Sequence, residues 1–590
     1  MKRKSFIYIA LKLFKISFSA APIHYSIYII FVILNGLSSA FLTLALQMFF
    51  DEIELGIKGK SITADIITML ILVGMVIVGS HIINGIDNFL SEALGEKVKR
   101  KYTEKIIEKS AQLDPILFES HEFLDTMNKA HSGMLNAYYF LGVSMVIFIY
   151  YLPYIIFMSI YLFNLNPMLA LILLLAFIPT MLSQIIRTGI FSKMEDKVAP
   201  IRRTYWHYTD AICGISYFKE TRLLGIYGFL KGKLVGTILR LQDATWDTQK
   251  KSRQLEAITK TLTLLGYGGV LILLVYAVLK QDISIGAFAA VFASIGTMFD
   301  TMNEAICIHI NNASHSLGSV RNFVDFIEYP VIERPEYQIS RNAGIVVENI
   351  TFQYPGSSYK ALDSVNFKIS PGETIAIVGE NGSGKTTLGR ILVGLFDPTE
   401  GQVLLGGKNI ADVNRDAAFE GVSAVFQKYQ KYQMTLRDNV HISNTTFDTD
   451  ENNIKDALSK SGLNITDQSF TDGLHTMLSR EFDGVELSGG QWQRVAIARG
   501  YYRSHEIILL DEPTAAVDPI EESNIYRQFA ELSKNKTAIL ITHRLGSTKL
   551  ADRILVLSQG KLVESGTHEE LMNQNKVYAQ MYIAQSQWYE

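Results

Sequence analysis

The sequence contains little cysteine and little charge. Its 590 residues include only two cysteines, Cys213 and Cys307, and its formal net charge at pH 7 is −3. Two cysteines provide neither a disulfide framework nor a cysteine-rich metal cluster. A balance so close to neutral gives no general basic excess for nucleic acid, so we expect no nucleic-acid partner. Charged residues make up 19% of the chain, below the usual share of about a quarter, and the deficit lies in the first half.

The length and one polar segment predict how the chain divides. A chain of this length is long for one domain. From Arg321 to about Asn342 the sequence becomes polar, and Pro330 and Pro335 interrupt it, which is typical of a linker. We therefore predict a first domain at 1–320, a linker at 321–342 and a second domain at 343–590.

The first half contains six apolar stretches, each close to the roughly 20 residues that a bilayer-spanning helix requires. They lie at about 23–50, 65–86, 137–165, 167–187, 260–279 and 283–305. Any one of them could be a buried helix of a soluble bundle. Two of them, however, lie in the uncharged stretch from Ala137 to Ile186, which argues against that alternative. We predict a membrane domain of six transmembrane helices.

The charges between these spans predict the orientation in the membrane. The first, third and fifth connections are acidic or nearly uncharged, whereas the long second and fourth connections are rich in lysine and arginine. The positive-inside rule then places both termini and both long connections in the cytoplasm. These two connections have helical spacing over Ser91 to Ala111 and Met194 to Arg240. We expect helices that extend beyond the membrane, with breaks near Pro115 and between Ala211 and Glu220.

The N-terminal segment and a few ionisable residues leave alternatives open. Ser5, Tyr8, Lys12, Lys15 and Ser19 share one helical face, which favours an amphipathic helix in the cytoplasmic interface over a signal peptide or a flexible tail. Ionisable side chains near the spans either line a substrate path or are solvated helix ends. They are His81, Asp87, Asp300, Glu304 and His309.

The second half alternates strand-like and helical patterns, which is typical of an α/β domain with a largely parallel sheet. The predicted strands are 345–347, 375–378, 507–510, 537–541 and 554–557. After the second of them comes a glycine-rich P-loop, Gly379-Glu380-Asn381-Gly382-Ser383-Gly384-Lys385-Thr386, and then a helix predicted over Leu388 to Leu395. Backbone N–H groups of such a loop approach phosphate oxygens closely. Lys385 can reach the β- and γ-phosphates, and the Thr386 hydroxyl can hold Mg²⁺.

Two further motifs accompany the P-loop. The buried run Ile507 to Leu510 ends in Asp511 and Glu512, of which Asp511 would orient Mg²⁺ and Glu512 is the candidate general base for a water molecule. The string Leu487-Ser488-Gly489-Gly490-Gln491 precedes a helix predicted to begin near Gln493. Its hydroxyl and backbone amides provide a second anion site.

Together these motifs resemble the ATP-binding cassette (ABC) superfamily, and six spans before one cassette resemble an exporter half-transporter. The resemblance implies ATP and Mg²⁺, with Tyr354 stacking on adenine and Gln427 sensing Mg²⁺ and water. His543 would contact the γ-phosphate, and Asp518 would lie in a loop at the dimer interface. It extends the ATP-binding set to Asn381, Gly382, Ser383, Gly384 and Thr387, and the Mg²⁺ set to Thr386, Gln427 and Asp511.

In this family two cassettes pack head to tail, so that the signature Leu487–Gln491 of one chain caps the ATP held by Lys385 of the other. The resemblance therefore implies a dimer, expected to be a homodimer, in the plasma membrane of a bacterium. ATP-driven export of a peptide, a lipid or an amphipathic drug is the leading hypothesis. The alternatives are a membrane ATPase that gates a channel or senses a peptide, and an importer, whose membrane part would normally be a separate chain.

Several segments depart from the family pattern. The loop before Asp518 reads Ala515-Ala516-Val517 and lacks the usual serine, and Lys428 to Gln433 lacks the usual apolar contact. The segment Glu481 to Glu486 also differs from drug exporters. Its Phe482-Asp483-Gly484, together with Trp492, resembles exporters of bacterial lantibiotic-type peptides.

Overall fold

The structure is a computed structural model that describes residues 4–214, 217–337, 344–445, 450–467, 469–512 and 519–587. It leaves out the side chains at 173, 174, 185, 188, 192, 193, 195, 196, 307, 311, 314, 315 and 519–523. The chain forms two compact units. The first is Met1–Ala111 with Asp125–Tyr329, and the second is Gln112–Leu124 with Pro330–Glu590. A short segment from the first half of the sequence thus belongs to the second unit.

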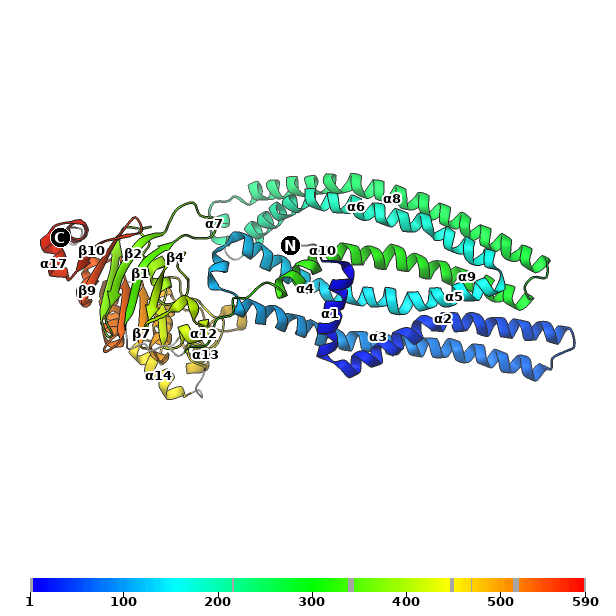
Figure 1. Cartoon of the computed structure of the whole chain (residues 1–590), viewed down its shortest axis with the longest axis horizontal. Coiled ribbons are helices and arrows are strands. Elements are labelled where there is room, and N and C mark those ends of the chain that lie inside the picture. The colour runs from blue at the N-terminus through cyan, green and yellow to red at the C-terminus, as the bar shows by residue number, and fades with distance from the viewer. Residues whose placement is uncertain are drawn as a thin grey trace. The chain divides into compact units, whose positions relative to one another are not determined.

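The first unit is built from helices (Figure 1). They are α1 (Phe6–Ala20), α2 (Pro22–Ile57), α3 (Thr63–Gln112), α4 (His121–Met145), α5 (Leu152–Leu165), α6 (Pro167–Cys213), α7 (Phe218–Leu223), α8 (Tyr227–Leu279), α9 (Ile285–Asn303) and α10 (Asn311–Ile327). Two π-helical segments, η2 (Val146–Tyr151) and η3 (Glu304–Ile310), join α4 to α5 and α9 to α10. Helix α10 extends into the segment predicted as linker, because Phe323, Val324 and Phe326 are fully buried.

Among the described residues, six helical stretches are long and apolar enough to cross a membrane. They are Pro22–Ile57, Thr63–Gln112, His121–Leu165, Pro167–Phe191, Tyr227–Leu279 and Ile285–Ile310. Five of the predicted spans fall within them, and the sixth, predicted at 283–305, begins two residues before the last stretch. At 1.5 Å per residue, the 50 residues of α3 extend about 75 Å, well beyond a hydrocarbon core of about 30 Å. The predicted helices beyond the membrane are therefore present. The predicted break near Pro115 coincides with η1 (Pro115–Glu119), and the one between Ala211 and Glu220 falls where α6 ends at Cys213 and α7 begins at Phe218.

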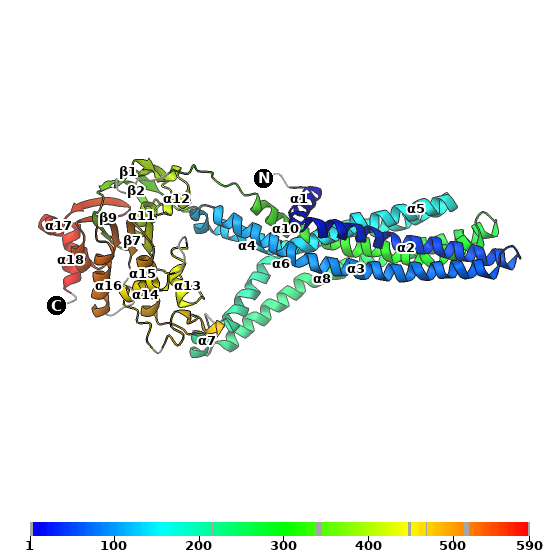
Figure 2. The ribbon, with the colours of Figure 1, turned by 90° about the horizontal axis from the view of Figure 1, so that it is seen from below.

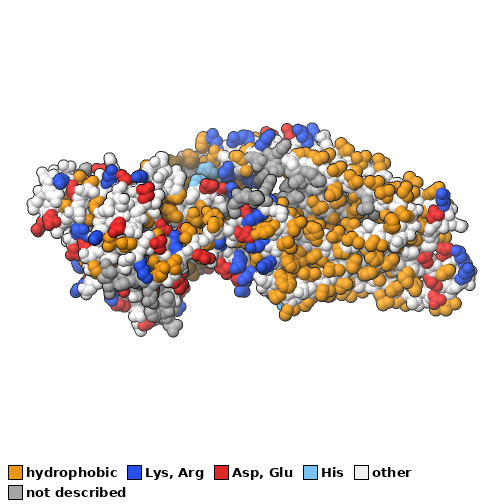
Figure 3. All heavy atoms as spheres, in the orientation of Figure 1, with side chains coloured by type: hydrophobic (Ala, Val, Ile, Leu, Met, Phe, Trp, Pro, Cys, Tyr) orange, Lys and Arg blue, Asp and Glu red, His pale blue; other side chains and the backbone are white. Residues whose placement is uncertain are grey.

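The surface of the helical unit is apolar over most of its length (Figure 3). Ile71, Met75, Val78 and Ile82 of α3 are each more than half exposed. Basic and acidic side chains gather at the ends of the helices (Figure 3). Exposed apolar surface of this extent is unfavourable in water but matches lipid, which supports six membrane spans.

Helices α6 and α8 lie side by side over much of their length (Figures 1 and 2). Polar side chains of the two helices contact one another. Thr180 Oγ1 lies 2.6 Å from Thr263 Oγ1, and Arg187 Nε donates to Ser252 Oγ at 2.8 Å. Arg187 is buried and also pairs with Glu256 of α8 at 3.3 Å. These contacts set the register between the two longest apolar helices of this unit's second half.

The N-terminal helix α1 runs across the bundle close to α10 (Figures 1 and 2). Ile9, Leu13 and Ser17 are its buried face. Of the predicted polar residues, Ser5, Tyr8, Lys15 and Ser19 are exposed and Lys12 is half-buried. Lys4 and Lys12 pair with Glu328, just after α10, at 2.6 and 2.5 Å. Burial alone would raise the pKa of Glu328, but these lysines and Tyr8 hold it at about 2. The helix predicted for this segment is present, and its place in the cytoplasmic interface stays a prediction.

The second unit contains two sheets flanked by helices. Its strands are β1 (Ile345–Phe352), β2 (Leu362–Ile369), β3 (Thr374–Gly379), β4 (Glu400–Leu405), β5 (Lys408–Asn409), β6 (Val422–Val425), β7 (Ile507–Asp511), β8 (Thr537–Ile541), β9 (Arg553–Ser558) and β10 (Lys561–Gly566). Its helices are α11 (Lys385–Leu392), α12 (Arg415–Phe419), α13 (Leu436–His441), α14 (Glu451–Lys460), α15 (Gly489–Tyr502), α16 (Pro519–Leu532), α17 (His568–Gln574) and α18 (Val577–Ser586).

The larger sheet has the strand order β10-β9-β3-β8-β7-β6, and all of its strands except β10 are parallel. All five predicted strands exist, but β1 belongs to a separate antiparallel sheet of order β2-β1-β4-β5. Its prediction as part of the parallel sheet is wrong. Apolar content alone does not distinguish the two sheets, because β1 is also largely buried.

Successive side chains along a strand point to opposite faces of the sheet, so neighbouring residues of β3 belong to different cores. Ile375 and Ile377 of β3 pack in the core that contains α11 and the antiparallel sheet. Ala376 and Val378 point the opposite way, toward the cluster with Tyr578 of α18. Both faces of the central strands are therefore covered, as a parallel sheet requires.

The segment Gln112–Leu124 is attached to the second unit by charge and by packing. Asp114 pairs with Arg334 at 2.9 Å and with Arg415 at 3.1 Å. Both arginines also pair with Asp397, each at 2.7 Å. Ile116 packs against the main core of the unit.

Candidate ATP site

The candidate site lies at the carboxyl ends of four neighbouring parallel strands. In the sheet order β3-β8-β7-β6, these ends lead into the P-loop, His543, Glu512 and Gln427. Carboxyl ends of adjacent parallel strands meet at one edge of a sheet, where α/β proteins bind their ligands. The topology thus brings together residues that are more than 160 positions apart in the sequence.

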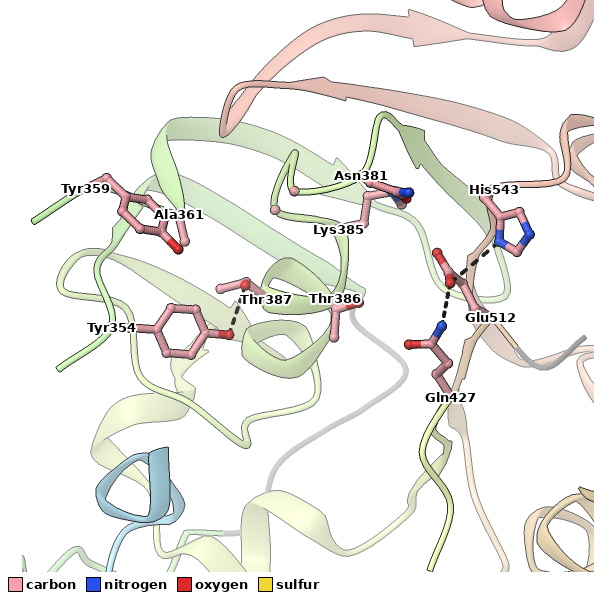
Figure 4. Close-up of a pocket in the computed structure, with 12 residues that line it drawn as sticks. Tyr354, Tyr359, Ala361, Asn381, Lys385, Thr386, Thr387, Gln427, Glu512 and His543 are labelled. Carbon is pink, nitrogen blue, oxygen red and sulfur yellow. Dashed lines mark hydrogen bonds and ion pairs between the residues drawn. The ribbon is translucent and has the colours of Figure 1, made fainter. Parts of the chain in front are cut away.

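These residues line a cavity of about 580 Å³ (Figure 4). Its lining comprises Tyr354, Tyr359, Ala361, Asn381, Gly382, Gly384, Lys385, Thr386, Thr387, Gln427, Glu512 and His543. Figure 4 shows two groups, with the tyrosines on one side of the P-loop and Gln427, Glu512 and His543 on the other. A cavity of this size accommodates a nucleotide.

The P-loop turns directly into helix α11, which begins at Lys385, three residues earlier than predicted. Gly384 caps the helix start with φ +101°, and a Cβ there would lie 2.5 Å from the Ala361 carbonyl oxygen. Only glycine fits this turn. Lys385 Nζ donates to the carbonyl oxygens of Gly379 and Glu380 at 2.9 and 3.0 Å. Burial lowers the pKa of Lys385, so a negative ligand would find a poorly solvated ammonium group.

One buried atom of the P-loop has no partner among the described residues. Ser383 is 4% exposed, and its Oγ makes no hydrogen bond. A buried hydroxyl without a partner costs free energy unless a ligand satisfies it. Together with Lys385 and the start of α11, this hydroxyl fits a phosphate group.

Asp511 and Thr386 form a polar pair beside the P-loop. Thr386 Oγ1 donates to Asp511 Oδ1 at 3.3 Å. Burial, reinforced by the neighbouring Glu512, raises the pKa of Asp511 to about 6. In the described parts of the chain, no group of three His, Cys, Asp or Glu side chains could hold a metal ion by itself. Mg²⁺ suits such a pair, because it binds through one or two protein oxygens together with substrate phosphates and water.

Glu512 accepts contacts from two sides. Gln427 Nε2 donates to Glu512 Oε2 at 2.8 Å, and His543 Nδ1 lies 3.5 Å from the same oxygen (Figure 4). The side chain of Glu512 is 13% exposed. Its backbone has φ +44°, a left-handed conformation that costs about 1 kcal/mol or more in a residue other than glycine. The carboxylate is thus held at the cavity edge by both its neighbours and its backbone.

Aromatic residues border the other end of the cavity. The ring of Tyr354 packs edge-on against Phe352 and Phe396, and its hydroxyl lies 3.0 Å from Thr387 Oγ1. Tyr359, which sequence reasoning missed, is 70% exposed and also lines the cavity. Its position five residues beyond Tyr354 and close before β2 was the available signal.

The signature Leu487–Gln491 forms the first turn of α15, which begins four residues earlier than predicted. Ser488 is the N-cap: its Oγ accepts from the Gln491 backbone N–H at 3.2 Å, while its own N–H donates to Gln491 Oε1 at 2.9 Å. Leu487 is buried, whereas Ser488 and Gly489 are exposed. None of the five signature residues, all of which are described, lines the cavity that contains Lys385.

Three other predicted features have different outcomes. Asp518 and the loop before it lie outside the described residues. Gly484 lies where a Cβ would come 2.1 Å from the Met477 carbonyl oxygen, so that turn requires glycine. In the membrane unit, Asp87 Oδ2 accepts from Asn35 at 2.9 Å and His309 lies 3.7 Å from Glu304. These contacts are compatible both with ionisable residues that line a substrate path and with solvated helix ends.

Comparison with known proteins identifies the family. The ABC transporter model matches residues 362–515, and the ABC transporter transmembrane region model matches residues 25–302. The subtilin transport ATP-binding protein of Bacillus subtilis is 27% identical over 85% of this chain and 82% of its own length. The nisin transport ATP-binding protein of Lactococcus lactis subsp. lactis is 32% identical over 50% of this chain and 49% of its own length. The ATP-dependent lipid A-core flippase of Haemophilus ducreyi is 33% identical over 52% of this chain and 53% of its own length.

A solved structure shares the fold over nearly the whole chain. The structure of a bacterial Atm1-family ABC exporter with ATP bound superimposes with a TM-score of 0.82 and 20% identity. The match covers 95% of this chain and 99% of the other. The predicted fold class and the predicted ATP hydrolysis coupled to transport are confirmed. The chain belongs to the ABC transporters and joins a multi-pass transmembrane region and an ATP-binding ATPase domain in one polypeptide.

Proposed function

We propose that two copies of this chain form an ATP-driven peptide exporter of a bacterial plasma membrane, with both termini in the cytoplasm. The observation that carries the dimer is the exposed signature turn at Ser488, which does not line the cavity of its own chain. The Ser488 hydroxyl accepts from Gln491 and can still donate its own proton, and together with the helix-start amides it forms an anion site. Among the described residues this turn does not line the cavity around Lys385, and a second chain packed head to tail supplies its ligand. Two identical sites result from two identical chains.

Within each site, the chain's own residues have distinct roles. Lys385, Ser383 and the P-loop amides of Asn381, Gly382 and Gly384 bind the phosphates, and Tyr354 stacks on the adenine. Glu512 is positioned as the general base, because its carboxylate is held at the cavity edge by Gln427. His543 faces the same carboxylate and orients it relative to the terminal phosphate. Asp518 is assigned to the dimer interface.

Three residues of this site would hold Mg²⁺. Thr386 would bind it directly, Asp511 through a water molecule, and Gln427 from the opposite side of the cavity. When bound, Mg²⁺ neutralises charge on the phosphates. Asp511 must be ionised for this role, and a nearby cation lowers its pKa from the value near 6.

The proposed orientation of the chain in the membrane rests on the charges of the connections between its spans. The lysine- and arginine-rich connections are those that continue into the cytoplasm under the positive-inside rule. ATP is available on that side. Relatives from several bacteria support a bacterial plasma membrane.

The proposal of a peptide substrate depends on relatives and on one departure in the sequence. Two of the most similar proteins are named for transport of subtilin and nisin, and the first match spans most of both chains. Phe482-Asp483-Gly484 and Trp492 resemble the same type of exporter. Others are named for a lipid, so lipid export is the second candidate.

The dimer is tested by Ser488→Arg. A bulky cation at this turn blocks contact with the partner chain's nucleotide, so we expect ATPase activity to fall by at least about 100-fold while ATP still binds to the P-loop. The matched control is Thr567→Arg. Thr567 is the N-cap of α17 and has the same capping box, with Glu570 in place of Gln491. Both variants lose a helix cap worth about 1 kcal/mol, but only the first affects the proposed site. Undiminished hydrolysis in Ser488→Arg would count against the two-chain site.

A further inference from the structure

The segment that follows Gln427 connects two parts of the ATPase unit that the proposed function assigns to different ATP sites. Tyr429 lies two residues after Gln427, between β6 and α13. Its hydroxyl donates to the carbonyl oxygen of Gly489 at 2.8 Å. Gly489 is the first residue of α15 and directly follows Ser488. Gln427 itself donates to Glu512.

The ring of Tyr429 is held in apolar surroundings on both sides. It packs against the cluster that contains Leu436 and Trp492, and also against the cluster that contains Val425 and Leu510. Burial raises the pKa of Tyr429, so the hydroxyl keeps its proton at neutral pH and remains a donor. The side chain therefore bridges the strand layer and the helical layer.

A second contact attaches the same segment to α15. Arg499 Nη1 donates to the Gln430 carbonyl oxygen at 2.9 Å, and its guanidinium lies 5.1 Å from the centre of the Tyr432 ring. Arg499 is ten residues beyond Gly489, which corresponds to about 15 Å along the helix. The segment is thus joined to α15 near both of its ends, so a displacement of the segment displaces the helix with it.

We propose that Tyr429 is a positioning residue that links the state of Gln427 in one ATP site to the signature turn that acts on the other. This inference rests on the proposed two-chain site. A shift of Gln427 relative to Glu512 moves Tyr429, and the Tyr429–Gly489 hydrogen bond transmits that shift to Ser488. In the sequence, Lys428 to Gln433 differs from the family pattern, and no function follows from that difference alone. The contact with Gly489 gives this segment a function.

The test is Tyr429→Phe in the full-length chain, reconstituted in lipid vesicles. Phenylalanine keeps the ring in its apolar surroundings and removes only the hydroxyl. The matched control is Tyr501→Phe. Tyr501 lies near the opposite end of α15, packs against the same two clusters, and donates from its hydroxyl to the Gln528 carbonyl oxygen at 2.7 Å. The two substitutions therefore remove the same kind of bond, and only one of these bonds reaches the signature turn.

The readouts are kcat, the Hill coefficient for ATP, and the Kd of a fluorescent ATP analogue. For Tyr429→Phe we expect kcat to fall about five-fold, the effect of one neutral hydrogen bond, and the Hill coefficient to fall toward 1, with an unchanged Kd. Tyr501→Phe should keep the wild-type kcat and Hill coefficient. The inference is overturned if Tyr429→Phe retains both wild-type values, or if the two variants lose activity equally. A wild-type Hill coefficient of 1 with undiminished hydrolysis in Ser488→Arg overturns the two-chain site and this inference together.

Discussion

At the scale of single residues, the site is arranged around carboxylates with different surroundings. Asp511 is buried beside Thr386, whereas Glu512 projects to the cavity edge between Gln427 and His543. Adjacent acids with different environments take different roles. A buried carboxylate such as Asp511 gains from binding a cation. The carboxylate of Glu512, which its neighbours hold at the cavity edge, is placed to act as a base.

The role of Glu512 is tested by Glu512→Gln. The amide can still contact Gln427, but it cannot accept a proton from water. We expect ATP to bind as before and kcat to fall by about 100-fold or more. The control is Glu506→Gln, since Glu506 lies just before the opposite end of the same strand β7. Measuring ATPase activity and nucleotide binding in both variants separates the two effects; a wild-type kcat in Glu512→Gln would remove Glu512 as the base.

The burial of Asp511 predicts a pH dependence of stability without Mg²⁺ and nucleotide. Its pKa is about 6 in the folded chain and about 3.8 when unperturbed. Between these values the folded chain keeps a proton that the unfolded chain has lost. The contribution of Asp511 to the free energy of unfolding therefore falls as the pH rises through this window, by up to about 3 kcal/mol above pH 6.

Replacing Asp511 by asparagine removes this dependence. We expect Asp511→Asn to raise the melting temperature of the ATPase unit at pH 7.5 and to raise it less at pH 4.5. The measurement is scanning calorimetry of the full chain in detergent at both pH values. Asp456→Asn, which alters an exposed pair with Lys460, serves as control. An equal gain at both pH values would contradict the assigned pKa.

At the scale of elements, sequence patterns predicted individual helices and strands better than the pairing between them. The six spans, the P-loop and the strands at 375–378, 507–510, 537–541 and 554–557 could be predicted because each has its own apolar period or glycine pattern. The pairing of β1 with β2 and β4 could not, since it depends on contacts between distant strands rather than on any local signal. The same reason explains why the contacts of Tyr429 were missed.

The attachment of Gln112–Leu124 to the ATPase unit is another such contact. Burial alone would raise the pKa of Asp114, but Arg334 and Arg415 hold it below its ordinary value. The side chain of Asp114 is 13% exposed and that of Arg334 is 9% exposed. When one partner of such a partly buried ion pair is lost, the remaining charge is left uncompensated and the local structure is strongly destabilised.

Asp114→Asn should therefore loosen this attachment. An uncharged amide leaves two arginines paired with Asp397 alone, so we expect amide hydrogen exchange in residues 112–124 to become about ten-fold faster or more. The P-loop should exchange as in the wild type. Asp125→Asn is the control, because the Asp125–Lys129 pair is exposed on both sides and contributes little. Unchanged exchange in 112–124 would show that packing of Ile116, not charge, holds the segment.

At the scale of the whole molecule, the chain combines a six-span membrane unit with an ATPase unit whose signature turn does not line the cavity around Lys385. Membership of the ABC transporters explains both features. The substrate could not be predicted from the sequence, because apolar spans specify lipid contact and not the shape of a pocket.

The most direct measurement is ATP-dependent uptake into inside-out membrane vesicles. The assay uses a radiolabelled lantibiotic-type peptide and compares the wild type with Glu512→Gln. The account predicts that wild-type vesicles accumulate the peptide against its gradient with ATP and Mg²⁺, and that Glu512→Gln vesicles do not. An ATPase that is stimulated by the peptide while no peptide accumulates would contradict peptide export and favour a gate or sensor.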